Sequence, residues 1–254
     1  MDASTLLAVF VFGTIIGSFL NVCIVRLPAG LSIVHPPSHC PGCERPISWY
    51  DNVPILSYVA LGGRCRRCRM RISPLYPTVE VLTGALAVAL WLRLGPGLAF
   101  AGYLAFAAAL VTITFIDLDH QIIPDVISLP GIAVGLAVSF VSPLVRPLDA
   151  ILGVLAGGGF LLLVAWAYQA IRGQEGMGGG DVKLLAMIGA FLGWQSLFVT
   201  IMVASIVGSV IGIALMLYQR ADTRLAIPFG PFLAGGALVH LFFGDRILAL
   251  YFGF

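Results

Sequence analysis

The sequence predicts an all-α polytopic membrane protein with about eight transmembrane helices and a cysteine-rich loop between the first and the second. Of the 254 residues, 59% are hydrophobic and only 10% are charged, and the mean hydropathy is +1.02. An average soluble domain carries about 25% charged residues. Long apolar runs recur along the chain, and a segment in lipid that is not part of a closed barrel must be helical to satisfy its backbone.

The expected spans follow from apolar windows, because a helix of about 20 apolar residues crosses the hydrocarbon layer. The sixth window is short, and only Gly193-Trp194-Gln195 separates it from the seventh, so six or seven complete crossings are the alternatives to eight. Glycines four residues apart, such as Gly153 and Gly157, indicate close helix packing. The windows are residues 6–25, 77–94, 98–116, 126–141, 148–171, 182–194, 197–217 and 229–243.

The positions of Lys and Arg predict which side of the membrane each loop faces. With the N-terminus outside, the outer segments contain only Arg93, Arg146 and Arg246. We therefore expect the N-terminus outside and the cysteine-rich loop inside. The inner segments then hold the other Lys and Arg residues, namely Arg26, Arg45, Arg64, Arg66, Arg67, Arg69, Arg71, Arg172, Lys183, Arg220 and Arg224.

Four cysteines in the loop of residues 27–76 have the spacing of a metal site. Cys40 and Cys43 form one CxxC pair, Cys65 and Cys68 form a second, and 21 residues separate the pairs. Two such pairs provide the tetrahedral S4 set of a structural zinc site. A pair of disulfides is the alternative, but disulfides rarely persist in the reducing cytoplasm. Cys23, inside the first span, is expected to be a buried packing residue.

Two aspartates at the edges of apolar runs are the candidate catalytic residues. Asp117 follows Thr114-Phe115-Ile116, and Asp181 follows Gly178-Gly179-Gly180. Ionisable residues retained in membrane segments are usually functional. An aspartic protease needs one carboxylate to activate water and a second, protonated one to polarise the scissile carbonyl, and the pair shares a proton.

Other charged residues near these segments are expected to have structural roles. We expect Asp119 to be a helix cap or a solvated loop charge, and Asp125 to be the N-cap of the fourth span. Lys183 is expected either to neutralise Asp181 or to contact lipid phosphate. Glu80 is expected to be an interfacial charge, and binding of a substrate amine in a polar cavity is the alternative.

Ordered motifs resemble those of the type IV prepilin peptidases. The first are Gly17-Ser18-Phe19-Leu20-Asn21-Val22 with Arg26-Leu27-Pro28, followed by the cysteine pairs with Asn52-Val53-Pro54, Gly63-Arg64, Ile72-Ser73 and Tyr76-Pro77-Thr78-Val79-Glu80. The later ones are Asp117-Leu118-Asp119-His120-Gln121-Ile122-Ile123-Pro124-Asp125 and Gly178–Leu184 with Leu192-Gly193-Trp194. After Gln195 the chain matches this family mainly in hydropathy.

The resemblance implies a bifunctional enzyme of the bacterial cytoplasmic (inner) membrane. Such enzymes cut the short basic leader from prepilins and pseudopilins on the cytoplasmic side, then N-methylate the new N-terminal residue with S-adenosylmethionine. By this resemblance Asp117 and Asp181 are catalytic and the four cysteines bind zinc. Residues 1–76 then form the first span and the methyltransferase-associated zinc loop, and residues 77–254 form the bundle with the peptidase site.

The resemblance also limits the expected partners. We expect prepilin substrates and the lipid bilayer, and no nucleic acid. The sequence contains no glycine-rich Rossmann fingerprint, so it does not place the methyl-donor site.

Two other functions use the same acidic residues. Asp117-x-Asp119 could hold Mg²⁺ and a diphosphate in a prenyl- or glycosyltransferase, but that function leaves Gly178–Asp181 unexplained. A proton-coupled transporter could use buried carboxylates as a relay, but it would place them near mid-membrane and show two similar halves.

Overall fold

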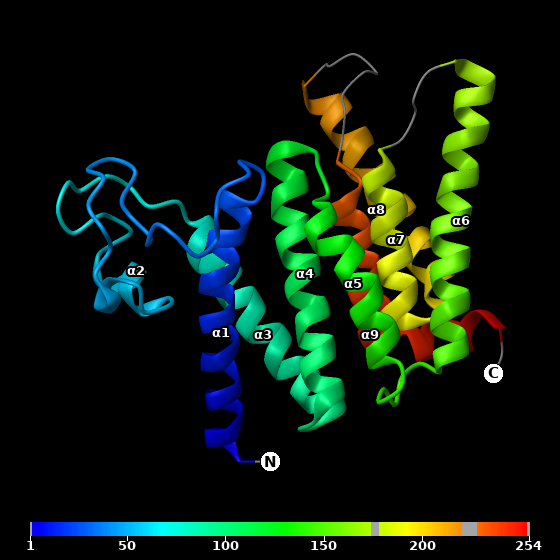
Figure 1. Cartoon of the computed structure of the whole chain (residues 1–254), viewed down its shortest axis with the longest axis horizontal. Coiled ribbons are helices and arrows are strands. Elements are labelled where there is room, and N and C mark those ends of the chain that lie inside the picture. Colours follow the sequence, from blue (N-terminus) through cyan, green and yellow to red (C-terminus); the bar gives the residue numbers. More distant parts are fainter. Residues whose placement is uncertain (1, 174–177, 220–227, 253–254) are drawn as a thin grey trace. The chain divides into compact units, whose positions relative to one another are not determined.

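The computed structural model describes residues 2–173, 178–219 and 228–252 (Figure 1). Within these ranges the regular elements are helices, and the only β pairings are two isolated bridges in the cysteine-rich loop. The all-α prediction is therefore confirmed. The helices are α1 (Ala3–Arg26), η1 (Trp49–Asp51), α2 (Leu56–Ala60), α3 (Leu75–Leu94), α4 (Leu98–His120), α5 (Asp125–Val138), α6 (Pro147–Arg172), α7 (Gly179–Leu192), α8 (Gln195–Gln219) and α9 (Gly230–Phe252).

Each of the eight predicted apolar windows forms a helix, but the helices differ in length. Six of those described, α1, α3, α4, α6, α8 and α9, are long and apolar enough to cross a membrane. The helices α5 and α7 have 14 residues each, which corresponds to about 21 Å at 1.5 Å per residue. The chain is thus a multi-pass membrane protein, and the count of eight complete crossings stays a prediction.

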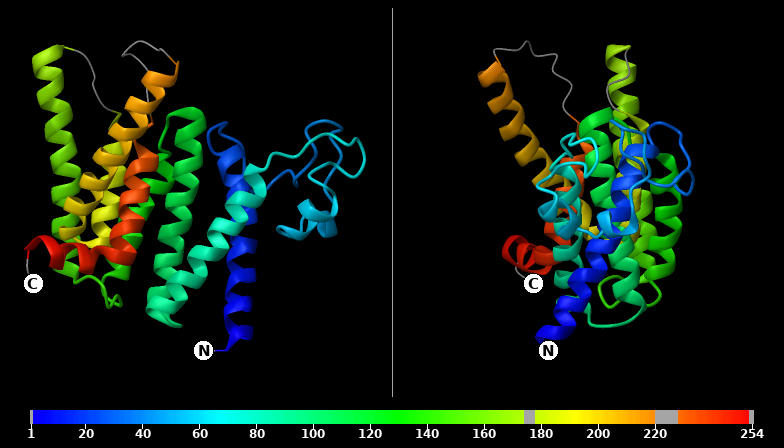
Figure 2. Two further views of the ribbon diagram at one scale, coloured as in Figure 1. Left: turned by 180° about the vertical axis from the view of Figure 1, so that it is seen from behind. Right: turned by 90° about the vertical axis from the view of Figure 1, so that its left-hand side faces the viewer.

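The chain forms two compact units, Met1–Thr112 and Ile113–Phe254. In the first unit α3 packs along α1 (Figure 2). The contact depends on Gly17, because a Cβ atom there would lie 2.7 Å from the Cα of Glu80. The Asn21 side chain, 3% exposed, donates a hydrogen bond to the Tyr76 carbonyl at 3.1 Å. The predicted division at residue 76 stays a prediction.

In the second unit α7 is the central helix and packs against α5, α6, α8 and α9. Residues 184–192 are all buried, so α7 has no lipid-facing surface over that length. It ends at Gly193, whose φ of +77° allows the chain to turn directly into α8. The helices α8 and α9 lie side by side in both views of Figure 2.

The closest helix contact in this unit joins α6 and α7. A Cβ atom on either Gly153 or Gly189 would collide with the backbone of the other glycine. Gly157 lies one turn further along α6 and faces α7 in the same way. A Cβ atom there would lie only 2.7 Å from the Leu185 carbonyl oxygen. The glycine spacing therefore does what the sequence predicts: it brings two helix backbones into contact.

Replacing Gly153 by alanine should lower the stability of this unit. The added methyl group collides with α7 backbone, and overpacking of this kind costs about 1–3 kcal/mol. Thermal unfolding of the detergent-solubilised protein measures the effect as a lower Tm. The matched control is Gly159→Ala on the same helix, because nothing lies within 4 Å of a Cβ at that position. An equal loss of Tm in both variants would contradict this packing.

Candidate active site and cysteine cluster

Asp117 lies in the last turn of α4 and is 5% exposed. Its Oδ2 accepts a hydrogen bond from the backbone N–H of Gly230, the first residue of α9, at 2.9 Å. A Cβ atom on Gly230 would lie 2.6 Å from the same oxygen. Only glycine therefore allows the α9 backbone to approach this carboxylate so closely.

Asp181 lies in the first turn of α7, three residues after the N-cap Gly178. It is partly buried, and its charge interacts with that of Asp117. The structure thus brings together the two aspartates that the sequence singles out. Ile123, in the segment between α4 and α5, lies beside the start of α7 and the start of α9, because it would lie 2.9 Å from a Cβ on Gly180 and 3.4 Å from a Cβ on Gly230.

The neighbouring charges correct two sequence predictions. Asp125 is the first residue of α5 and not its N-cap, which is Pro124. Lys183 neither neutralises Asp181 nor is free for lipid phosphate, because its Nζ binds both oxygens of Asp125 at 2.7 and 2.8 Å. This pair ties α7 to the start of α5. Asp119 is exposed, as expected of a solvated charge, but it lies in the last turn of α4 and not in a loop.

Sequence reasoning missed Gly230. It stands between Phe229 and Pro231 at the start of the last apolar run, which indicates a helix start but no chemistry. Its role depends on a hydrogen bond to a residue 113 positions earlier. With it, the site offers two carboxylates that interact, one of them fixed by a backbone donor, which is an arrangement suited to general acid–base chemistry.

The four loop cysteines form a cluster in the Met1–Thr112 unit. The sulfur atoms of Cys40, Cys43, Cys65 and Cys68 all lie within 4.8 Å of one another, and all four thiols are free. Tetrahedral zinc with Zn–S bonds of about 2.3 Å places its sulfurs about 3.8 Å apart. The Cys40 and Cys68 sulfurs are 3.6 Å apart, so the cluster could hold such an ion. His39, the residue before Cys40, is not part of this cluster. Cys23 is a buried residue of α1, as predicted.

The two CxxC pairs have the same backbone geometry. In the first, Cys40 N–H donates to the Arg45 carbonyl at 3.0 Å, and in the second Cys65 N–H donates to the Met70 carbonyl at 2.8 Å. The residue four positions after each leading cysteine, Glu44 or Arg69, has φ near +60° and closes the turn. Each loop thus presents two sulfurs on one side of a tight turn.

The local environment makes these thiols unequal. The backbone N–H groups of Cys68 and Arg67 stabilise the Cys65 thiolate and lower its pKa to about 6. The Met70 N–H also favours the Cys68 thiolate, but burial and the neighbouring thiols outweigh it and raise the pKa of Cys68 to about 11. Four adjacent sulfurs cannot all ionise without a cation, so a bound metal would remove a real electrostatic conflict.

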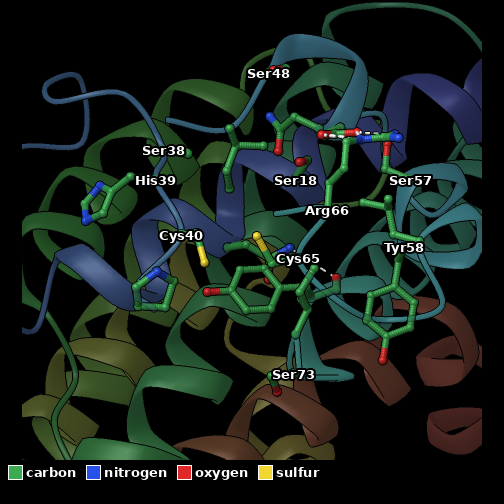
Figure 3. A pocket seen from close by; sticks show the side chains of 18 of the residues that line it. Ser18, Ser38, His39, Cys40, Ser48, Ser57, Tyr58, Cys65, Arg66 and Ser73 are labelled. Atoms are coloured by element: carbon green, nitrogen blue, oxygen red, sulfur yellow. Dashed lines mark hydrogen bonds and ion pairs between the residues drawn. The ribbon is translucent and has the colours of Figure 1, made fainter. Parts of the chain in front are cut away.

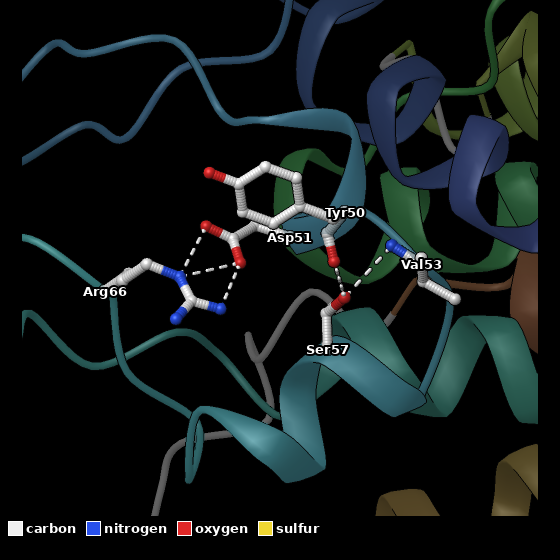
Figure 4. Close-up of polar contacts among 5 residues, drawn as sticks. All are labelled: Tyr50, Asp51, Val53, Ser57 and Arg66. Atoms are coloured by element: carbon white, nitrogen blue, oxygen red, sulfur yellow. Dashed lines mark hydrogen bonds and ion pairs between the residues drawn. The ribbon is translucent and has the colours of Figure 1, made fainter.

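A cavity of about 510 Å³ lies beside the cluster, between the loop and the adjoining ends of α1 and α3. Figure 3 shows Cys40, Cys65 and Ser18 around it. One wall is braced by Arg66, which binds both carboxylate oxygens of Asp51, with contacts from 2.7 Å (Figure 4). Ser57 adds a second brace, because it donates to the Tyr50 carbonyl and accepts from the Val53 N–H.

Glu80 also lines this cavity, which corrects its assignment as an interfacial charge. The residue is only 7% exposed, and it lies on α3 opposite Gly17 of α1. A buried carboxylate that faces a cavity is the alternative that the sequence left open.

Comparison with known proteins gives matches along almost the whole chain. The bacterial peptidase A24 N-terminal domain matches residues 11–94, and the type IV leader peptidase family matches residues 104–213. The prepilin leader peptidase/N-methyltransferase of Aeromonas hydrophila is 40% identical over 96% of this chain and 92% of its own length. The chain belongs to this family. The proteins of the same name from Stutzerimonas stutzeri and Pseudomonas aeruginosa are 36% and 35% identical, each over 98% of this chain and 94% and 93% of their own lengths. No solved structure matches it.

The two family matches divide the functional features between them. The cysteine cluster, the cavity and Glu80 fall within the A24 N-terminal match, whereas Asp117 and Asp181 fall within the leader peptidase match. The features that the sequence selected are therefore distributed over both parts of the family architecture.

Metal analysis should find about one zinc ion per purified chain, because the four sulfurs together complete the tetrahedral coordination of one ion. Replacing Cys40 and Cys43 together by serine should abolish this zinc. Elemental analysis by mass spectrometry gives the ratio. Cys23→Ser is the control, since this buried cysteine lies on α1 outside the cluster. Wild-type protein without zinc, or unchanged zinc in the double variant, would contradict the assignment.

Proposed function

We propose that this enzyme removes the short basic leader from type IV prepilins and pseudopilins by aspartic proteolysis, and then methylates the new N-terminal amine. The observation that carries the peptidase part is the pairing of Asp117 and Asp181 within the Ile113–Phe254 unit. The names of the relatives, which join leader cleavage to N-methylation, support both activities.

The proteolytic step follows from two carboxylates that hold one proton between them. Two nearby negative charges repel, so one aspartate stays protonated while the other is ionised. The ionised member removes a proton from water, which attacks the scissile carbonyl, and the protonated member donates to the carbonyl oxygen. The proton then passes to the leaving amine as the peptide bond breaks. Gly230 holds Asp117 in place throughout, because its N–H is fixed at the start of α9.

The site fits cleavage at the cytoplasmic membrane surface. Asp117 ends a membrane-spanning helix and Asp181 begins a buried one, and the distribution of Lys and Arg supports the cytoplasmic side for both. Among the predicted inner charges, Arg220 and Arg224 lie outside the described residues. We place the enzyme in the bacterial inner membrane with its N-terminus outside.

The second activity needs a methyl donor, which we take to be S-adenosylmethionine, and an ordered loop. We assign zinc to the four-cysteine cluster as a structural ion. It supplies no chemistry in this scheme, and it fixes the loop that forms one side of the cavity. The Mg²⁺-dependent transferase and the proton-coupled transporter have less support, because neither explains the pairing of Asp117 with Asp181.

The function is tested by incubating purified enzyme with a prepilin, with and without S-adenosylmethionine. Mass spectrometry should show loss of the leader in both samples and a gain of one methyl group only with the donor. Asp117→Asn and Asp181→Asn should each reduce cleavage by about 10²-fold or more, because an amide cannot transfer the proton. The exposed Asp119→Asn is the control and should cleave normally. Normal cleavage by either of the first two variants would refute the catalytic pair.

Gly230→Ala should reduce cleavage while the protein stays folded. The new methyl group would stand 2.6 Å from the Asp117 Oδ2 and would displace the carboxylate. A misplacement of about 1 Å can cost about 10²-fold in rate. Gly235→Ala is the matched control on α9, since nothing lies within 4 Å of a Cβ there. The same cleavage rate in both variants would show that Gly230 does not position Asp117.

A further inference from the structure

Glu80 is a buried carboxylate that the proteolytic mechanism does not use. It lies on α3 in the Met1–Thr112 unit, faces the 510 Å³ cavity and is 7% exposed. Among the described residues no Lys, Arg or His forms an ion pair with it. An uncompensated carboxylate inside a protein is costly, and in membrane segments such residues usually have a function.

The surrounding backbone holds Glu80 in one position. Its Oε2 accepts the Ile55 N–H at 2.7 Å, and the Ser18 side chain also hydrogen-bonds to the carboxylate. Ile55 has φ of +61°, which is a strained conformation for a β-branched residue. Such strain persists only where surrounding structure imposes it, and it is concentrated at functional sites. Here it directs a backbone N–H toward Glu80.

These donors leave part of the carboxylate free, because two ionised oxygens can accept about four hydrogen bonds. Because Glu80 lines the cavity, this remaining capacity suits a bound cation with N–H groups, such as an amine. The other lining carboxylate, Asp51, is already bound by Arg66. Glu80 is therefore the acid of this cavity that is available to a ligand.

The rest of the cavity suits a nucleoside-like methyl donor. A volume of about 510 Å³ is within the range of about 300–1,000 Å³ typical of small-molecule sites. Tyr58 offers an aromatic ring, and Arg45, Arg67 and Arg71 offer guanidinium groups that have no carboxylate partner among the described residues. An adenine ring and an amino-acid carboxylate are the groups that such side chains bind.

We infer that this cavity is the methyl-transfer site and that Glu80 is a catalytic residue there, which binds the new N-terminal amine and takes its proton. This inference rests on the proposed methyltransferase activity. It names the place of methyl transfer, which the sequence leaves unassigned.

The chemistry requires such a base. An α-amine has a pKa of about 7.7–8.0, so near neutral pH most of it is ammonium and has no lone pair. In the proposed step the ammonium proton passes to the Glu80 carboxylate, and the amine nitrogen then forms a bond to the methyl carbon of S-adenosylmethionine. The S–CH₃ bond breaks with its electron pair on sulfur, giving neutral S-adenosylhomocysteine. The methylated nitrogen carries the positive charge that the sulfonium loses.

The first arm of the test uses Glu80→Gln and a synthetic peptide with the sequence of a mature pilin N-terminus, so that leader cleavage is not needed. The glutamine oxygen can still accept the Ile55 N–H, which preserves a purely structural role. Methylation at pH 7 should fall by about 10²-fold or more, the usual contribution of a general base. It should recover partly between pH 7 and 9, because free amine then forms without a base. Asp2→Asn, at an exposed carboxylate of the same unit outside the cavity, is the matched control.

The second arm locates the donor by binding. S-adenosylhomocysteine should bind wild-type enzyme and Glu80→Gln with similar affinity in isothermal titration calorimetry. Ser48→Trp should weaken binding by about 10-fold or more, because Ser48 lines the cavity and a tryptophan side chain there would occupy part of its volume. Ser4→Trp, at the exposed start of α1, is the control.

The outcomes separate this inference from the proposed function. If wild-type enzyme cleaves and methylates but Glu80→Gln methylates the peptide normally, the role of Glu80 is refuted and the proposed function stands. If Ser48→Trp binds S-adenosylhomocysteine as tightly as wild type, the location of the donor is refuted. If wild-type enzyme methylates nothing, the proposed function itself fails. Prepilin cleavage by Glu80→Gln verifies the fold of the unit that holds the aspartates, and a zinc content equal to that of wild type verifies the fold of the loop beside the cavity.

Discussion

The burial of the short helix α7 is the constraint on which the peptidase site depends. With 14 residues it is about 21 Å long at 1.5 Å per residue, shorter than the hydrocarbon layer of about 30 Å, and it is enclosed by α5, α6, α8 and α9. The enclosure needs backbone contact, which Gly153 and Gly189 allow. Because residues 184–192 are fixed on every side, the N-terminal turn of α7 has a defined position, and Asp181 is held with it.

Asp117 is fixed by a tertiary hydrogen bond. The start of α9 presents a backbone donor to its carboxylate, and the absence of a side chain on Gly230 permits the approach. Donors that are fixed before reaction need no reorganisation during it. The ion pair of Lys183 with Asp125 then leaves Asp181 without a competing cation from Lys183. The two aspartates are thus held by packing and hydrogen bonds and not by mutual attraction, since their charges repel.

Much of this arrangement could be predicted from the sequence, because it depends on strong local signals. Apolar runs identified the helices, CxxC spacing identified the cysteine cluster, and charge at the edge of apolar runs identified Asp117 and Asp181. Three of the misassigned or missed residues depend on tertiary contacts, whereas Asp125 differs from its predicted role by one position at a helix start. Lys183 meets a partner 58 positions away, Gly230 one 113 positions away, and Glu80 becomes buried only because α1 and the strained Ile55 close over it. No periodicity or spacing encodes these pairings.

The loop of the Met1–Thr112 unit has almost no hydrophobic core, so other contacts must stabilise it. Between residues 27 and 74 only Cys40 is buried, so apolar burial cannot hold the loop in one conformation. Its order comes from polar contacts such as the cysteine cluster, the Arg66–Asp51 pair and the Glu80 contact to Ile55, all within that unit. The supports of the aspartate pair all come from Ile113–Phe254. Since substitutions at sites without shared partners act nearly independently, loss of the cluster should leave the aspartates positioned. An enzyme built in this way can carry two chemistries whose structural requirements do not conflict.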